Sequence, residues 1–123
     1  MTQQQTEKTV LVVEDDAGIG HVLVQFIGQE TPYHPLLVTT GSDALQAVRV
    51  TRPSLLLLDY RLPGMTGIEL YDHLQSTEGG AAIPAIMISA TLPHREIVQR
   101  QIVGMKKPFD IDNLLQTIEN LIR

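Results

Sequence analysis

Residues 55–59 read LLLLD, four leucines that lead directly into an acid. A strand that is apolar on both faces is buried in a sheet with helices on both sides, as parallel sheets are. Residues 10–16 read VLVVEDD, so a second apolar stretch also ends in acids. Because ligands of such sheets bind beyond the carboxyl ends of the strands, we expect these acids to gather at one edge of the sheet.

A cluster of carboxylates at that edge has an electrostatic cost. At about 4 Å and an effective dielectric constant near 20, each pair of like charges costs on the order of 4 kcal/mol. The acids must bind a cation, keep a proton or spread apart, and a hard divalent cation is the simplest solution. Taken alone, Glu14, Asp15 and Asp16 are more typical of a helix N-terminus than of a metal site. Asp59 is the residue that favours the metal site.

The composition is that of one ordinary globular domain. The chain has 123 residues, 43% of them hydrophobic, and a net charge of -5. We expect a single domain over residues 1–123, with a frayed N-terminus over about residues 1–8. The nine scattered basic residues argue against a surface for nucleic acid or an anionic membrane. No apolar run is long enough for a signal peptide or a membrane span, so we expect a cytoplasmic protein.

Short apolar runs alternate with helical patterns along the chain, which indicates strand–helix units and a parallel sheet. The predicted strands cover about 9–14, 35–39, 54–59, 84–89 and 102–106. Asp16 is the predicted N-cap of the first helix, and Ser42 or Asp43 starts the second. The segment 93–101 holds few apolar residues, so the fourth helix is expected to be short or irregular. We therefore expect an α/β fold, a doubly wound five-stranded parallel sheet with helices on both faces.

Two further strand ends add chemistry to the same edge. The predicted fourth strand ends at Ser89, and Lys107 follows the fifth. Three carboxylates, a hydroxyl and an ammonium together suit Mg²⁺ and a phosphoryl group. Each residue also has an ordinary structural explanation, since Ser89 can satisfy a backbone group and Lys107 can be a solvated charge. Strand alternation sends Lys106 outward and Lys107 inward.

Four segments of the chain resemble the receiver (CheY-like) domains of two-component response regulators. They are VLVVEDD at 10–16, LLLLDYRLPGMTGIEL at 55–70, MISA at 87–90 and KPF at 107–109. Each segment is weak evidence alone, but together they cover nearly the whole chain in the family's order. The resemblance implies a flavodoxin-like strand order of 2-1-3-4-5 and a function as a phosphoacceptor in two-component signalling.

The resemblance also implies a role for each acid. Asp59 would be the phosphoacceptor and would form an aspartyl phosphate. Asp15 would bind Mg²⁺ directly and Glu14 through water, while Arg61 would contribute its backbone carbonyl. A carboxylate nucleophile that faces Mg²⁺ and a lysine needs no general base, which agrees with this assignment.

The phosphoryl group would then be held by Ser89 and Lys107. Ser89 would hydrogen-bond a phosphoryl oxygen, and Lys107 would pair with Asp59 or its phosphate. The domain would catalyse its own phosphorylation from a phosphohistidine and its own slow dephosphorylation, tuned by Arg61 and Thr91. It would not turn over an external substrate.

The implied partner is a histidine kinase or a histidine phosphotransfer domain. In this family the donor docks on the first helix, where Ile19, Val22 and Val24 offer apolar contact. No effector segment follows residue 123 in the sequence, so we expect the output to be a protein contact or to lie in a segment beyond it. Direct binding to nucleic acid or a membrane is not expected.

The chain departs from the family's pattern at Gly104. Receivers commonly carry an aromatic residue there, three positions before the lysine, and the segment between Ser89 and Lys107 looks a few residues shorter than usual. The aromatic switch is therefore in doubt. We hypothesise that Asp59 phosphorylation signals through another surface, or through order and disorder in residues 91–103.

The sequence bears on three alternative functions. A dehalogenase-like phosphatase would need a second acid two residues after Asp59, where Arg61 stands. A dinucleotide-binding fold would need a glycine-rich loop that this sequence lacks. The remaining alternative is a receiver-like interaction module that is not phosphorylated, favoured by Gly104 and opposed by the complete set of acids, serine and lysine.

Overall fold

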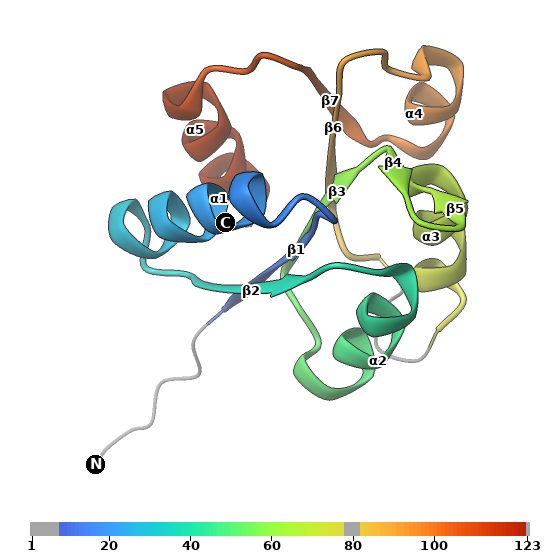
Figure 1. Cartoon of the computed structure of the whole chain (residues 1–123), viewed down its shortest axis with the longest axis horizontal. Helices are drawn as coiled ribbons and strands as arrows, with labels where there is room; N and C mark the ends of the chain where they lie inside the picture. The colour runs from blue at the N-terminus through green and yellow to red at the C-terminus, as the bar shows by residue number, and fades with distance from the viewer. Residues whose placement is uncertain (1–7, 78–81, 123) are drawn as a thin grey trace.

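A five-stranded parallel sheet forms the centre of the molecule (Figure 1). The computed structural model describes residues 8–77 and 82–122. The strands are β1 (Thr9–Val13), β2 (His34–Val38), β3 (Leu55–Asp59), β6 (Ala85–Ser89) and β7 (Val103–Lys106). Their order in the sheet is β2-β1-β3-β6-β7, which confirms the predicted fold class. The N-terminal segment that we expect to fray lies, apart from Lys8, outside the described residues.

The helices divide between the two faces of the sheet. Helices α1 (Ala17–Glu30) and α5 (Ile111–Ile122) cover one face, and α2 (Gly41–Thr51), α3 (Gly67–Gln75) and α4 (His94–Arg100) cover the other (Figure 1). Each face has its own core because alternate residues of a strand point to opposite sides. Leu56 and Leu58 pack toward α2 and α3, whereas Leu55 and Leu57 pack toward α1 and α5. The leucine run is thus buried on both faces, as its sequence predicts.

Most helix starts follow from local capping. The side chain of Asp16 accepts a hydrogen bond from Ile19 N at 3.0 Å, so Asp16 is the N-cap of α1 as predicted. The predicted start of α2 was wrong by one or two residues: the helix begins at Gly41, and Thr40 caps it. A Cβ at position 41 would lie 2.7 Å from Met65 Sδ. A larger residue there would therefore have to displace the Met65 side chain, which packs closely against the start of α2.

One element was missed entirely. Strands β4 (Arg61–Leu62) and β5 (Met65–Thr66) form a small antiparallel hairpin between β3 and α3. Its turn contains Pro63 and Gly64, and Gly64 has a φ of 78°, a left-handed conformation that glycine adopts without strain. Two-residue strands are too short to show a periodic pattern. The hairpin connects Asp59, the last residue of β3, to the start of α3.

The short fourth helix was predicted correctly. α4 has seven residues, of which Ile97 is the buried one. Among the described residues, none of the helices combines the length and apolar character that crossing a bilayer requires.

Candidate functional site

Asp59 is the last residue of β3, the central strand of the sheet. Its side chain is only 10% exposed. The backbone N–H of Arg61 lies 3.4 Å from Asp59 Oδ1 and donates to it. Asp59 therefore sits at the carboxyl edge, where a parallel sheet holds its ligands.

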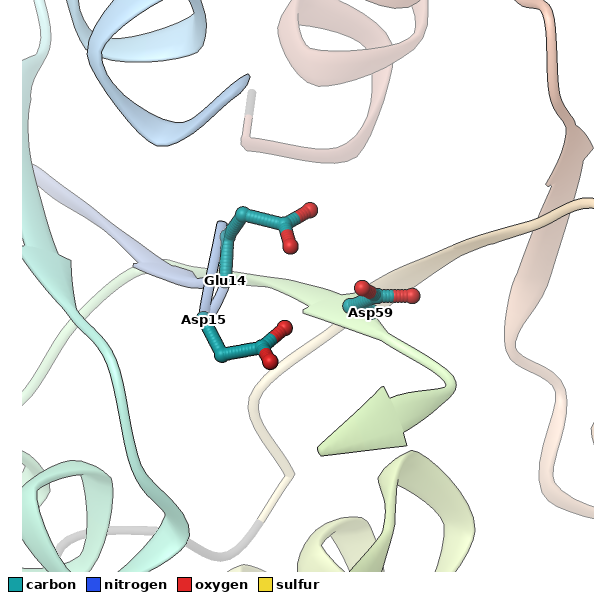
Figure 2. Close-up of side chains that lie close together, drawn as sticks. All are labelled: Glu14, Asp15 and Asp59. Atoms are coloured by element: carbon teal, nitrogen blue, oxygen red, sulfur yellow. The ribbon is translucent and has the colours of Figure 1, made fainter. Parts of the chain in front are cut away.

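Glu14 and Asp15 follow the neighbouring strand β1. The N–H of Glu14 donates to Val38 O at 3.1 Å, which extends the pairing of β1 with β2 and fixes the residue at the edge. Oxygen atoms of Glu14, Asp15 and Asp59 all lie within 4.8 Å of one another. Figure 2 shows the three carboxylates grouped around one space beyond the ends of β1 and β3. The predicted acidic cluster is present.

Lys107, which follows the edge strand β7, reaches the same cluster. Its Nζ lies 3.7 Å from Asp59 Oδ2 and 3.9 Å from Glu14 Oε1. The N–H of Lys107 donates to Ser89 O at 2.9 Å, which ties the lysine to the end of β6. Lys106 is exposed, so alternation along β7 places the two lysines as expected. One ammonium thus faces two carboxylates.

Burial gives Glu14 unusual electrostatics. Glu14 is 3% exposed, and this desolvation raises its pKa to about 7. The N–H of Asp16, which donates to Glu14 Oε2 at 3.1 Å, and the charge of Lys107 oppose the rise, whereas Asp59 adds to it. Near neutral pH the cluster can therefore keep a proton on Glu14, which relieves part of the repulsion among the acids.

The donors of this cluster fit a hard divalent cation. They are carboxylate oxygens, which Mg²⁺ prefers, and they stand close enough to share one ion. Three carboxylates against one ammonium leave a negative site, so a cation would be held electrostatically as well. Arg61, the predicted carbonyl ligand, lies in β4 two residues after Asp59, and its side chain is exposed.

Ser89 ends β6 and is 4% exposed. Its hydroxyl donates to Thr91 O at 2.9 Å and accepts from Thr91 N at 3.2 Å. The hydroxyl therefore closes a tight local turn in this structure. Ser89 thus satisfies backbone groups, as its structural explanation expects, and it also stands beside Lys106 and Lys107 at the site's edge.

Residues 10–119 match a family model described as the response regulator receiver domain. The chain belongs to this family. Membership of this family agrees with the strand order of the sheet and with the acidic cluster at its carboxyl edge. The family places the protein in two-component signalling.

Relatives of this receiver domain include longer regulators. The DNA-binding response regulator MtrA of Mycolicibacterium paratuberculosis is 32% identical over 118 residues, an alignment that covers 93% of this chain and 51% of MtrA. The probable transcriptional regulatory protein TcrX of Mycobacterium tuberculosis is 30% identical, with 94% of this chain and 50% of TcrX covered. The chain thus spans about half the length of the curated relatives it matches.

Solved receiver structures superimpose closely on this one. The signal receiver domain of a DNA-binding response regulator from Colwellia psychrerythraea is 26% identical, with a TM-score of 0.83 and coverage of 94% of this chain and 98% of that one. Such agreement over nearly the full length leaves no ambiguity about the fold.

An apolar groove, which the sequence analysis did not predict, lies beside the receiver's acids. It has a volume of about 800 Å³ and lies next to Lys107, between the start of α1 and the segment after β7. Ile19 and Val22, two of the three residues expected to offer apolar contact on the first helix, line it together with Ala90 and Phe109, whereas Val24 does not. The KPF motif contained Phe109, yet only the fold brings it beside α1.

Proposed function

We propose that this receiver domain accepts a phosphoryl group on Asp59. The convergence of Glu14, Asp15 and Lys107 on the Asp59 carboxylate is the observation that carries the proposal. An Asp59 oxygen would attack the phosphorus of a phosphohistidine, the P–N bond would break, and the imidazole nitrogen would keep the electron pair. Because an ionised carboxylate is already nucleophilic, no general base is required.

The acids would hold Mg²⁺ during this transfer. Glu14, Asp15 and Asp59 would bind it, together with the backbone carbonyl of Arg61. The chemistry that the ion supplies is charge neutralisation, since phosphoryl transfer depends mainly on alignment and electrostatic stabilisation.

Lys107 and Ser89 would act on the phosphoryl oxygens. The Lys107 ammonium is 3.7 Å from Asp59 Oδ2 and would offset the added charge. The Ser89 hydroxyl would donate to a phosphoryl oxygen after leaving Thr91. Hydrolysis of the aspartyl phosphate by water would return Asp59 to its free form. Arg61 and Thr91, which lie beside the site, would tune the rate of this hydrolysis. The domain would change only its own phosphorylation.

The apolar groove supports a protein donor. Ile19, Val22 and Phe109 form an apolar surface next to Lys107, and Val22 is 50% exposed. A histidine kinase or histidine phosphotransfer domain that placed a helix there would bring its phosphohistidine to Asp59. We propose that this transfer takes place in the cytoplasm. We also propose that residues 1–123 form a single receiver domain.

The output is proposed to be a protein contact. MtrA is described as a DNA-binding regulator, but this chain covers only 51% of it. The net charge of -5 argues against direct binding of this receiver to nucleic acid, because such binding needs positive charge to neutralise phosphates. A longer protein could place a separate DNA-binding segment under the receiver's control.

The second candidate is a receiver-like interaction module without phosphorylation. Gly104 favours it, because a Cβ there would lie 2.6 Å from Ile97 Cδ1, so the position that is usually aromatic is filled by other side chains. Such a module would bind its partner equally well with or without phosphoryl donors.

A phosphorylation assay separates the two candidates. Incubation with acetyl phosphate and Mg²⁺ should add one phosphoryl group to the intact mass, in a linkage that hydroxylamine cleaves as an acyl phosphate. Asp59→Asn should abolish the increase, whereas Asp43→Asn, which changes an exposed acid of α2, should retain it. An unmodified wild-type protein under saturating donor would favour the interaction module.

A further inference from the structure

Gly67, the first residue of α3, packs directly against the backbone of the proposed phosphoacceptor. A Cβ added at this position would lie 2.5 Å from Asp59 O and 3.2 Å from Tyr60 Cα. Backbone atoms cannot turn aside as the end of a flexible side chain can, so a methyl group there would have to push β3 and α3 apart. The φ of Gly67 lies outside the left-handed region. The close approach to Asp59, and not the backbone conformation, therefore favours glycine.

The start of α3 is held in this place by its own hydrogen bonds. The N–H of Gly67 donates to Tyr60 O at 2.6 Å, which closes the β4–β5 hairpin at its base. Thr66 and Glu69 form a reciprocal capping box, with bonds of 3.1 and 2.9 Å between side chain and backbone. Leu70, in the same turn of the helix, is fully buried. The first turn of α3 therefore has little freedom to retreat from a side chain at position 67.

The hairpin connects this contact to the functional site through Arg61. Arg61 pairs with Thr66, the residue just before Gly67. The N–H of Arg61 also donates to Asp59 Oδ1, at 3.4 Å. One short segment thus rests on the carbonyl of Asp59 through Gly67 and contacts the carboxylate of Asp59 through Arg61. A displacement of Gly67 would change the position of Arg61 relative to the acids.

We propose that Gly67 is a positioning residue for the metal site. By letting α3 lie on the Asp59 backbone, it holds Arg61, the proposed carbonyl ligand of Mg²⁺, in a fixed place beside the three carboxylates. This role rests on the proposed Mg²⁺ binding and names a determinant of its affinity that has no ligand atom of its own. Substitution of residues that orient metal ligands commonly weakens metal binding by roughly 10- to 100-fold.

Titration of Gly67→Ala with Mg²⁺ tests this role in the intact chain. Amide chemical shifts report both the fold and the dissociation constant of Mg²⁺. Gly67→Ala should weaken Mg²⁺ binding on the order of tenfold. The amide signal of Arg61 should already differ from that of the wild type without metal. With acetyl phosphate as donor, the Mg²⁺ concentration that half-saturates the phosphorylation rate should rise by the same factor as the dissociation constant.

Gly20→Ala is the matched control, because Gly20 is a buried glycine of α1 far along the chain from the hairpin. Its Cβ would stand 2.9 Å from Leu37 Cδ1, the end of a side chain that can turn aside. Gly20→Ala should therefore keep the wild-type Mg²⁺ affinity, even where it lowers the unfolding temperature. A loss of affinity equal to that of Gly67→Ala would show that any crowded glycine has this effect, and would overturn the role of Gly67.

A double variant separates the backbone contact from side-chain packing. The Cβ at position 67 would also lie 2.9 Å from Met87 Cε. Met87→Leu removes this atom at similar side-chain volume and should leave Mg²⁺ binding unchanged on its own. Gly67→Ala with Met87→Leu should regain stability relative to Gly67→Ala but should keep the weakened Mg²⁺ binding. Recovery of the affinity as well would assign the effect to Met87 and overturn positioning through Asp59.

Thr66→Ala provides a second test if Gly67→Ala does not fold. It removes the N-cap that holds the first turn of α3 in place, so it should also weaken Mg²⁺ binding severalfold. Thr40→Ala removes the corresponding N-cap of α2, whose hydroxyl accepts from Asp43 N at 3.1 Å. This control should lose similar stability and keep the wild-type Mg²⁺ affinity.

The outcomes separate this role from the proposed function. A folded Gly67→Ala that binds Mg²⁺ as tightly as the wild type would overturn the positioning role and leave phosphorylation of Asp59 intact. The same holds for Thr66→Ala where it stands in for Gly67→Ala. A wild type that binds no Mg²⁺ and accepts no phosphoryl group would overturn the proposed function, and the role of Gly67 with it.

Discussion

Burial of Glu14 makes the stability of the fold depend on pH. Its folded pKa of about 7 lies above the ordinary value of 4.5, because burial penalises the charged form. The folded protein therefore keeps a proton that the unfolded chain has lost, so rising pH disfavours folding between these values.

The first prediction concerns this pH dependence. Between about pH 4.5 and 7, Glu14 should remove roughly 1 to 3 kcal/mol of unfolding free energy as pH rises without metal. Glu14→Gln cannot ionise, so the difference between wild type and variant should grow across this window. Urea unfolding at a series of pH values measures it. Parallel curves for the two proteins would refute the raised pKa.

At the scale of elements, the ion pair between α3 and α4 has a testable effect. Arg100 lowers the pKa of Asp72 through their hydrogen bonds, but Asp72 is about half exposed, so the pair should add at most about 1 kcal/mol. Asp72→Asn should therefore lower the unfolding free energy slightly while clearly raising amide exchange at the C-terminal end of α4. Asp43→Asn is the matched control. Equal exchange in the two variants would show that the pair does not anchor α4.

The elements that carry the site could be predicted because their sequences were unambiguous. Buried strands such as 55–59 leave no choice of face, and parallel strands bring their carboxyl ends together. The β4–β5 hairpin could not be predicted, because two-residue strands have no period. The start of α2 was misplaced because several neighbouring residues can cap a helix, and the structure uses Thr40.

The residues of the site could be predicted from the sequence, but their protonation and their side-chain contacts could not. Glu14, Asp15, Asp59 and Lys107 follow strand ends, so their proximity follows from topology. The raised pKa of Glu14 depends on how completely the surrounding fold buries it. The bonds of Ser89 to Thr91 and the packing of Leu92 on Gly104 depend on side-chain positions that no spacing reveals.

At the scale of the whole molecule, the charge of the functional edge opposes the stability of the fold. Two hydrophobic cores hold the sheet from either side, while three carboxylates share one ammonium at its carboxyl edge. Like charges brought together by folding are farther apart in the unfolded chain. Their repulsion therefore lowers the free energy of unfolding of the metal-free protein. A bound cation should recover that loss.

Asp15→Asn gives the last prediction, in which stability and binding change in opposite directions. Without Mg²⁺, removing this exposed carboxylate should raise the unfolding temperature by roughly 1 to 3 °C, because repulsion from Glu14 and Asp59 falls. With Mg²⁺ at a hundred times its dissociation constant, the wild type should gain about 2.7 kcal/mol, whereas the variant should gain little. Asp43→Asn changes the net charge equally outside the cluster and should keep the full Mg²⁺ response. Calorimetric scans with Mg²⁺ and with a chelator measure both effects. Equal Mg²⁺ stabilisation of Asp15→Asn and the wild type would mean that the cation binds elsewhere.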